Sequence, residues 1–268
     1  MKLAYSTLAC PNWSLEQIID AAQRNGYEGL EFRLLNGDIL PADLDNATRN
    51  RVKAQCVAAG LKIICVDTSI KIASQDTDGR AAQIRDGIAY LEMAAEWGAP
   101  FIRVFGGTPE GTSKADALEV SIECLTALAE HGKDLDVRVL LETHDAFSSS
   151  GAVMDVLNQV PNAGALWDTL HPYRVGEQPA ETAACLAERC YHVHVKDGRR
   201  NGSDKWDLVL LGEGDVPVPG ILMTLKSRGY DGWLSVEWEK KWHPEIAEPE
   251  IAIPQHADVL RKYLAEVS

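Results

Sequence analysis

Four short apolar runs in the second half of the chain end in residues that can bind a cation. They are LLETHD at 140–145, LWDTLH at 166–171, YHVHVKD at 191–197 and LSVEWE at 234–239. Because side chains alternate between the two faces of a strand, each run can present one carboxylate or imidazole in one direction, namely Glu142, Asp168, His194 and Glu237. Such an oxygen-rich set suits one divalent metal ion (Mn²⁺, Mg²⁺, Co²⁺ or Zn²⁺) and leaves coordination positions for substrate oxygens.

The spacing of these four residues indicates strands separated by helices. Successive members of the set are 26, 26 and 43 positions apart, and each interval is long enough for a helix between two parallel strands. In a closed barrel of parallel strands, the carboxyl ends meet at one face, with neighbouring strands about 4.8 Å apart. Side chains from four consecutive strand ends can therefore reach the same cation, which predicts a metal site at that face.

The rest of the chain continues the same alternation. We expect strands at residues 3–7, 27–33, 61–67, 101–105, 137–142, 164–168, 191–196 and 233–238. Apolar residues at helical spacing predict helices at residues 15–25, 47–59, 80–97, 114–130, 151–159, 178–188, 217–228 and 250–266. Residues 198–215 are expected to form a long loop. Eight strands and eight helices favour a (β/α)8 TIM barrel, as a single domain over residues 1–268, with an open sheet as the alternative.

Composition narrows the class of protein. The 268 residues are 46% hydrophobic, which suffices for one large domain with a substantial core. The formal net charge of −14 disfavours nucleic acid and acidic membranes as partners, and a small neutral substrate is easier to accommodate. The six cysteines show no CxxC spacing, which indicates reduced thiols. Because we find neither a membrane-spanning apolar stretch nor a signal peptide, we expect a cytoplasmic protein.

These motifs, in this order, resemble those of the xylose isomerase-like TIM-barrel superfamily of sugar isomerases and epimerases. The superfamily also holds inosose dehydratases and isomerases, hydroxypyruvate isomerases, ketose 3-epimerases and endonuclease IV. The resemblance extends over essentially the whole chain and is strongest from residue 137 onward. It implies that Glu142, Asp168, His194 and Glu237 bind one divalent metal ion. It also implies that Glu142 and Glu237 form the acid/base pair.

The resemblance further implies residues that contact the substrate. Asp168-Thr-Leu-His171 matches a family motif whose histidine contacts the substrate, and His-Val-Lys-Asp at 194–197 resembles the signature of the seventh strand. Arg200 falls where ketose epimerases place a substrate-facing arginine. The chain departs from those epimerases at Ser148, where they have a further substrate-binding glutamate. The identity of the sugar therefore does not carry over.

Several other polar residues allow two interpretations. His144 either contacts the substrate or lines the barrel mouth, and Lys196 either orients the substrate or neutralises surplus acid; we count both among the substrate-binding residues. His192 is expected to be a barrel-interior histidine with satisfied hydrogen bonds. Glu31 and Arg33, at the end of the second strand, are expected to pair with each other.

Three classes of enzyme can be built on such a site. The first is a metal-dependent isomerase or epimerase of a sugar or related polyhydroxy ketone or aldehyde, which transfers a proton through a metal-stabilised enediolate. The second is a dehydratase of a keto-cyclitol or related keto-sugar, in which His171, Lys196 or His144 would protonate the departing hydroxyl. The third, DNA cleavage as in endonuclease IV, requires histidines that the second and third strands lack. We predict the first class, with the dehydratase as the alternative, and leave a homo-oligomer open.

Overall fold

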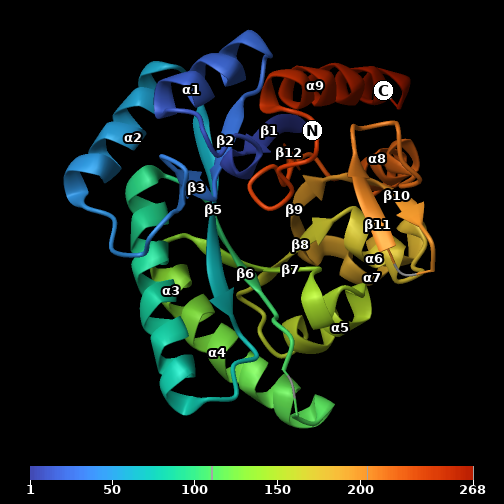
Figure 1. Ribbon diagram of the computed structural model, residues 1–268. Coiled ribbons are helices and arrows are strands. Elements are labelled where there is room, and N and C mark those ends of the chain that lie inside the picture. Colours follow the sequence, from blue (N-terminus) through green and yellow to red (C-terminus); the bar gives the residue numbers. More distant parts are fainter. Residues whose placement is uncertain (110, 204, 268) are drawn as a thin grey trace.

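The computed structural model describes residues 1–109, 111–203 and 205–267 and contains a closed barrel of eight parallel strands (Figure 1). The barrel strands are β1 (Lys2–Ser6), β2 (Gly29–Phe32), β5 (Lys62–Lys71), β6 (Phe101–Phe105), β7 (Arg138–Glu142), β8 (Gly164–Asp168), β9 (Cys190–Val195) and β12 (Trp233–Val236). They are neighbours in chain order, and β12 pairs with β1 to close the barrel. The prediction of a single (β/α)8 TIM barrel is confirmed.

Helices surround the barrel, as Figure 1 shows. They are α1 (Leu15–Arg24), α2 (Asn46–Ala58), α3 (Thr77–Trp97), α4 (Lys114–Asp134), α5 (Ser150–Leu157), α6 (Leu170–Arg174), α7 (Pro179–Leu186), α8 (Val218–Ser227) and α9 (Pro249–Glu266), with the 3-10 turns η1 (Thr7–Ala9), η2 (Asp145–Phe147) and η3 (Ala187–Arg189). All eight expected helices and strands are present, and α6 is an additional short helix. Within the described residues, no helix is both long and apolar enough to span a bilayer.

Two hairpins interrupt the strand–helix alternation. One consists of β3 (Leu34–Leu35) and β4 (Asp38–Ile39), and the other of β10 (Asp197–Asn201) and β11 (Lys205–Val209). The expectation of a loop over residues 198–215 is therefore wrong for residues 198–201 and 205–209. The physical reason is a two-residue alternation in β11, where Trp206 and Leu208 pack against the core while Lys205 and Asp207 are exposed.

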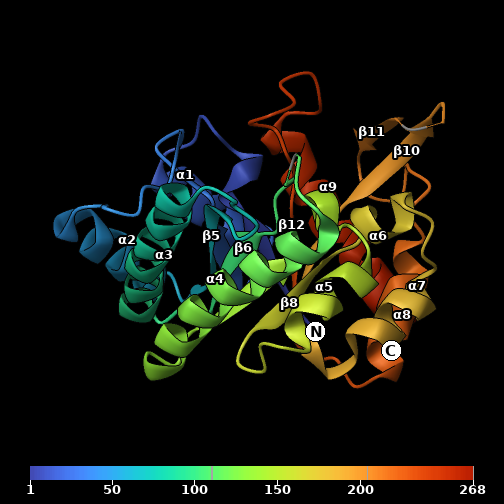
Figure 2. The same ribbon diagram turned by 90° about the horizontal axis from the view of Figure 1, so that it is seen from below.

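The two ends of the barrel differ in what they carry. In Figure 2 the β10–β11 hairpin and the segment that connects β12 to α9 project on one side, and both chain ends are labelled on the other. The projecting side follows the carboxyl ends of the strands, which is where enzymes of this fold place their active sites. A functional site is therefore expected on that side of the barrel.

The sequence repeat at two helix–strand junctions has a structural cause. Gly26 after α1 and Gly229 after α8 adopt positive φ values of 63° and 76°. In both places the N–H of the following tyrosine, Tyr27 or Tyr230, reaches back to a carbonyl of the helix, at 2.9 Å and 3.0 Å. Glycine adopts this left-handed conformation without steric cost, so the chain leaves both helices in the same way.

Candidate metal centre and active site

The structure brings together the four residues that the sequence nominates as metal ligands. Glu142 and Asp168 are the last residues of β7 and β8, His194 is the next to last of β9, and Glu237 follows β12. Strand register sets His194 beside both Asp168 and Ser235. One ligand atom from each of the four lies within 4.8 Å of the others, and all four side chains are buried. This donor set fits one divalent cation, whose charge would offset the cost of burying three carboxylates.

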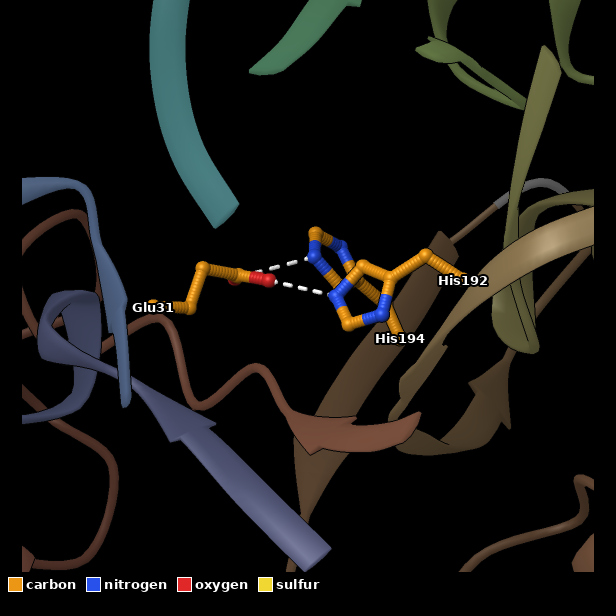
Figure 3. A group of neighbouring side chains, drawn as sticks. All are labelled: Glu31, His192 and His194. Atoms are coloured by element: carbon orange, nitrogen blue, oxygen red, sulfur yellow. Dashed lines mark hydrogen bonds and ion pairs between the residues drawn. The ribbon is translucent and has the colours of Figure 1, made fainter. Parts of the chain in front are cut away.

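A buried glutamate on the opposite side of the barrel orients His194 (Figure 3). Glu31 of β2 directs one oxygen to Nε2 of His192, at 2.6 Å, and the other to Nε2 of His194, at 3.0 Å. Nδ1 of His194 then faces the oxygens of Glu142 and Glu237, at 3.3 Å and 3.5 Å. A histidine that donates one N–H to a carboxylate presents its other nitrogen in a fixed direction, as metal-binding histidines commonly do.

The carboxylate of Asp168 is held from both sides. Its Oδ1 accepts the backbone N–H groups of Leu170 and His171, at 2.8 Å and 3.3 Å. Its Oδ2 lies 2.9 Å from Nζ of Lys196, and the same ammonium contacts Glu237 at 2.6 Å and also Glu239. Lys196 is buried, so its charge balances these acids within the chain.

Arg103 is a site residue that the sequence analysis did not identify. It lies on β6 with its side chain inside the barrel, where Nε is 3.2 Å from Glu142 Oε2 and 3.6 Å from Asp67 Oδ1. Its Nη1 donates to the carbonyl of Thr68 at 3.0 Å, and the guanidinium lies 3.9 Å from the ring centre of Phe105. The sequence does contain a signal for it. An arginine in the middle of the apolar run FIRVF indicates a buried charge, and a buried charge needs partners.

Burial and neighbouring charges shift the pKa values in opposite directions. Burial alone would raise the pKa of Glu237, but Lys196 and His194 lower it well below its ordinary value. Burial opposes protonation of His194, yet Glu31 and Glu237 raise its pKa well above the usual range. Burial and the nearby Glu31 raise the pKa of Asp67. In the absence of metal, Glu237 is therefore a carboxylate and His194 an imidazolium.

A cavity of about 490 Å³ opens at the barrel mouth beside the four candidate ligands. Of the four, Glu237 lines it, and Glu142 contacts the lining residue Arg103, with Oε2 3.2 Å from Nε. The other lining residues are Leu8, Arg33, Ser69, Lys71, Arg103, Phe105, His144, Asp145, Glu239 and Trp242. A cavity of this size, lined mainly by polar and charged groups, suits a small polyhydroxylated molecule.

Two histidine rings pack against each other at the edge of this cavity. The rings of His144 and His171 lie 4.4 Å apart in an edge-to-face arrangement, and only His144 reaches the cavity wall. Burial disfavours a charge on His144, but the carboxylate of Asp145, whose Oδ1 lies 2.9 Å from Nδ1, and the proximity of Glu142 raise its pKa. Burial lowers the pKa of His171 well below its usual value, although Asp168 lies 3.8 Å away. His144 is therefore the better proton donor of the two.

Two expectations about individual residues do not agree with the geometry. Glu31 and Arg33 do not pair, because Glu31 faces the two histidines while Arg33 donates to Ser69 Oγ at 2.9 Å. Arg200 does not line the cavity beside Glu237. It lies on the β10–β11 hairpin and lines a separate hollow of about 620 Å³. His192 is a fully buried barrel-interior histidine, as expected, and its Nε2 bonds to Glu31, but its Nδ1 has no hydrogen-bond partner among the described residues, so the expectation of satisfied hydrogen bonds holds for only one ring nitrogen.

The chain belongs to the xylose isomerase-like TIM barrel family, whose model matches residues 19–263. Among its relatives, the inosose isomerase of Halalkalibacterium halodurans is 24% identical over 252 residues, which are 88% of this chain and 87% of that protein. The rhizopine catabolism protein MocC of Rhizobium meliloti is 33% identical and is matched over 88% of this chain and 77% of its own length. The inosose dehydratase of Clostridium beijerinckii is 34% identical over a shorter stretch, 38% of this chain and 37% of that enzyme.

Solved structures share the fold at lower sequence identity. The structure of the IOLI protein, described with a bound zinc atom, superposes with a TM-score of 0.83 and 18% identity, over 100% of this chain and 98% of that one. That protein therefore shares the barrel fold of this chain.

Proposed function

We propose that the protein is a divalent-metal-dependent isomerase or epimerase of a sugar or a related polyhydroxy ketone or aldehyde. The observation that carries the proposal is the convergence of Glu142, Asp168, His194 and Glu237, with one ligand atom of each within 4.8 Å of the others, beside a cavity of about 490 Å³. The similarity to an inosose isomerase supports the same class of chemistry. When bound, the cation would supply a Lewis acid that stabilises negative charge on two adjacent substrate oxygens.

Glu237 is the residue we assign to proton removal, because its carboxylate lines the cavity and is ionised. Glu142 is assigned to the return of the proton, either on the opposite face of the same carbon or at the neighbouring carbon. Arg103, 3.2 Å from Glu142 Oε2, holds that carboxylate in place. Each glutamate needs one oxygen free of the metal for this task, since coordination lowers the basicity of a carboxylate.

A dehydratase is the second candidate, and His144 is the observation in its favour. Loss of a β-hydroxyl requires an acid that protonates the leaving oxygen, and His144 lines the cavity with a pKa that the neighbouring carboxylates of Asp145 and Glu142 raise despite burial. The similarity to inosose dehydratases supports this candidate as well. Lys196 is less suited to the role, because its ammonium is engaged with Asp168, Glu237 and Glu239.

Incubation in D₂O separates the two candidates. Ketoses, keto-cyclitols and their phosphates would be incubated with the protein and Mg²⁺, Mn²⁺ or Zn²⁺, and the products analysed by mass spectrometry. Deuterium uptake without loss of water identifies an isomerase or epimerase, whereas loss of water identifies a dehydratase. Absence of both reactions across the panel would contradict the proposed class.

The metal is tested separately from turnover. Asp168→Ala removes an oxygen ligand on a rigid strand, so the variant should lose bound metal together with activity. Elemental analysis after dialysis measures the metal content. Asp207→Ala, on the exposed face of β11, is the matched control and should retain it. Stoichiometric metal in Asp168→Ala would contradict the assignment of this ligand.

A further inference from the structure

We propose that the active-site cavity takes a substrate with an anionic group, a carboxylate or a phosphate monoester, bound by Arg33 with Lys71 beside it. The inference rests on the proposed function, since it names the substrate class of the same site. It also differs from the expectation of a neutral substrate that the net charge of −14 favours. Overall charge governs long-range encounter, whereas the few groups that line a cavity govern what binds inside it.

The cavity wall has two chemically different halves. The candidate metal ligands come from β7, β8, β9 and the end of β12. The facing half presents three cationic side chains to the cavity: Arg33, directly after β2, Lys71 of β5 and Arg103 of β6. A bound molecule that offers its ketone and hydroxyl oxygens to the first half therefore directs its far end toward the cations of the second half.

Most charges around the cavity already have partners of opposite sign. Arg103 contacts Glu142, and Glu237 and Glu239 share the ammonium of Lys196. Asp145 Oδ1 lies 2.9 Å from Nδ1 of His144. These groups balance one another, so none of them calls for a charged substrate.

Arg33 differs from these groups because no carboxylate of the described residues lies within ion-pairing distance of it. Its Nη1 contacts only neutral oxygens, Ser69 Oγ at 2.9 Å and the carbonyl of Asp67 at 3.5 Å. The side chain is 94% buried, since its exposed fraction is 6%. Burial and the neighbouring Arg103 lower its pKa to about 10. A buried guanidinium at a cavity wall without an anionic partner is disfavoured until an anion binds to it.

Two further features fit an anion at this position. A guanidinium presents several N–H donors in one plane, which matches the oxygens of a carboxylate or a phosphate. Lys71 lies at the same wall, four residues beyond Asp67 on β5, with an exposed side chain and no ion pair within the described part of the chain. Lys71 therefore attracts an anion into the mouth, and Arg33 binds it inside.

Three ligands with the same carbon chain test the proposal: sorbitol, which is neutral, gluconate, which ends in a carboxylate, and sorbitol 6-phosphate. Binding is measured by calorimetry on metal-free protein, so that neither metal coordination nor turnover contributes. We expect at least one anion to bind about tenfold or more tightly than sorbitol, the effect of one charge-assisted hydrogen bond. The preferred anion distinguishes a carboxylate substrate from a phosphate substrate.

Variants then locate the binding group. Arg33→Met should abolish the preference for the anion, and Arg33→Lys should restore part of it. Lys71→Met, at an exposed position where folding is not at risk, should weaken anion binding a few-fold. Arg174→Met is the matched control, because Arg174 is an exposed arginine that lines the separate hollow beside Arg200.

The results that would overturn the proposal are distinct from those that concern turnover. Sorbitol binding as tightly as both anions would contradict it, as would wild-type anion affinity in a folded Arg33→Met and in Lys71→Met. Loss of anion binding in Arg174→Met alone would move the site to the other hollow. If Arg33→Met does not fold, Arg33→Lys and Lys71→Met decide. If no deuterium is taken up in D₂O but the anions still bind, the proposed reaction is contradicted and the proposed anion site is not.

Discussion

The carboxylate of Glu31 lies 3.0 Å from Nε2 of His194, on the side of the imidazole ring opposite the candidate metal ligands. Burial would raise the pKa of Glu31, but His194 and His192 lower it well below its usual value, so the group is ionised and forms an ion-pair contact with each ring. The other oxygen of this carboxylate, Oε2, lies 2.6 Å from Nε2 of His192. Glu31 thereby fixes which nitrogen of His194 is available to a cation.

The first prediction concerns this carboxylate. Glu31→Gln removes its charge and offers an amide donor where His194 needs an acceptor, so Nδ1 is no longer held toward Glu142 and Glu237. We expect metal affinity to fall about 10–100-fold, the usual effect of losing such an outer partner. Competition with a chromophoric chelator measures the affinity directly and does not depend on a known substrate.

A matched control separates this effect from general destabilisation. Glu177 is a half-buried glutamate outside the site that accepts from the N–H of Ser150 and the hydroxyl of Thr182, at 2.9 Å and 2.8 Å. Glu177→Gln keeps one acceptor oxygen and replaces the other by an amide donor, while metal affinity should stay at the wild-type level. Equal metal affinity in Glu31→Gln and the wild-type protein would show that His194 needs no orienting partner.

The ends of the barrel strands could be predicted because the relevant signals are local. Glu142, Asp168 and His194 each end an apolar run, and two-residue alternation alone gives the direction of each side chain. The intervals between them are set by helices, so the order around the barrel follows from the order in the chain. Convergence of these residues is therefore a consequence of closing the barrel.

The partners of Glu31 and Arg33 could not be predicted in the same way. The two residues are two apart on one strand and point in the same direction, so a local ion pair was the simplest interpretation. The barrel instead sets Glu31 opposite His192, 161 positions later in the chain, and Arg33 beside Ser69. Which residues meet across the interior depends on the register of strands from distant parts of the sequence. That register is not encoded in any single segment.

The second prediction separates metal binding from proton transfer. Glu237→Gln keeps an oxygen that can coordinate but loses the basic carboxylate, so metal affinity should fall modestly and turnover by at least about 10²-fold. Turnover is followed as deuterium exchange into a substrate found in the D₂O panel. Glu239→Gln is the control, because Glu239 also contacts Lys196 and lines the cavity but is not a candidate ligand. Near wild-type exchange in Glu237→Gln would transfer the base role to His144 or Lys196.

The third prediction concerns stability in acid. His256 on α9 is 1% exposed, its Nδ1 donates to the carbonyl of Ala252 at 2.6 Å, and its ring packs against Trp238. Burial lowers its pKa from 6.5 to about 4. Between pH 6.5 and 4, His256 is protonated in the unfolded chain but neutral in the folded protein. The free energy of unfolding therefore falls as the pH drops toward 4. Protonation of this group alone should lower the free energy of unfolding by about 2 kcal/mol between pH 7 and pH 5.

His256→Leu tests the assignment, because leucine fills the site and cannot be protonated. Urea unfolding at pH 7 and pH 5 should show a smaller acid-induced loss in this variant than in the wild-type protein. His131→Leu, at a half-buried position on α4, controls for the removal of a histidine elsewhere. An unchanged pH dependence in His256→Leu would assign the acid sensitivity to other groups.

The last prediction concerns His171, which lies in α6 three residues beyond Asp168. Its Nε2 is 3.8 Å from Asp168 Oδ2, and it is absent from the group of four whose ligand atoms lie within 4.8 Å of one another. His171→Ala should therefore keep its metal. It should lose a neutral hydrogen-bond donor near the substrate and the packing partner of His144, so we expect kcat/KM to fall about 10–10³-fold.

Metal analysis and steady-state kinetics on His171→Ala and His144→Ala separate the roles of these two histidine rings. Because His144 lines the cavity and His171 lies behind it, a larger fall in His144→Ala would identify His144 as the residue that touches the substrate. A larger fall in His171→Ala would require His171 to reach the substrate itself, past the ring it now packs against. If His171→Ala came out free of metal, His171 would be a ligand. The assignment of one metal ion held by four strand ends would then be wrong.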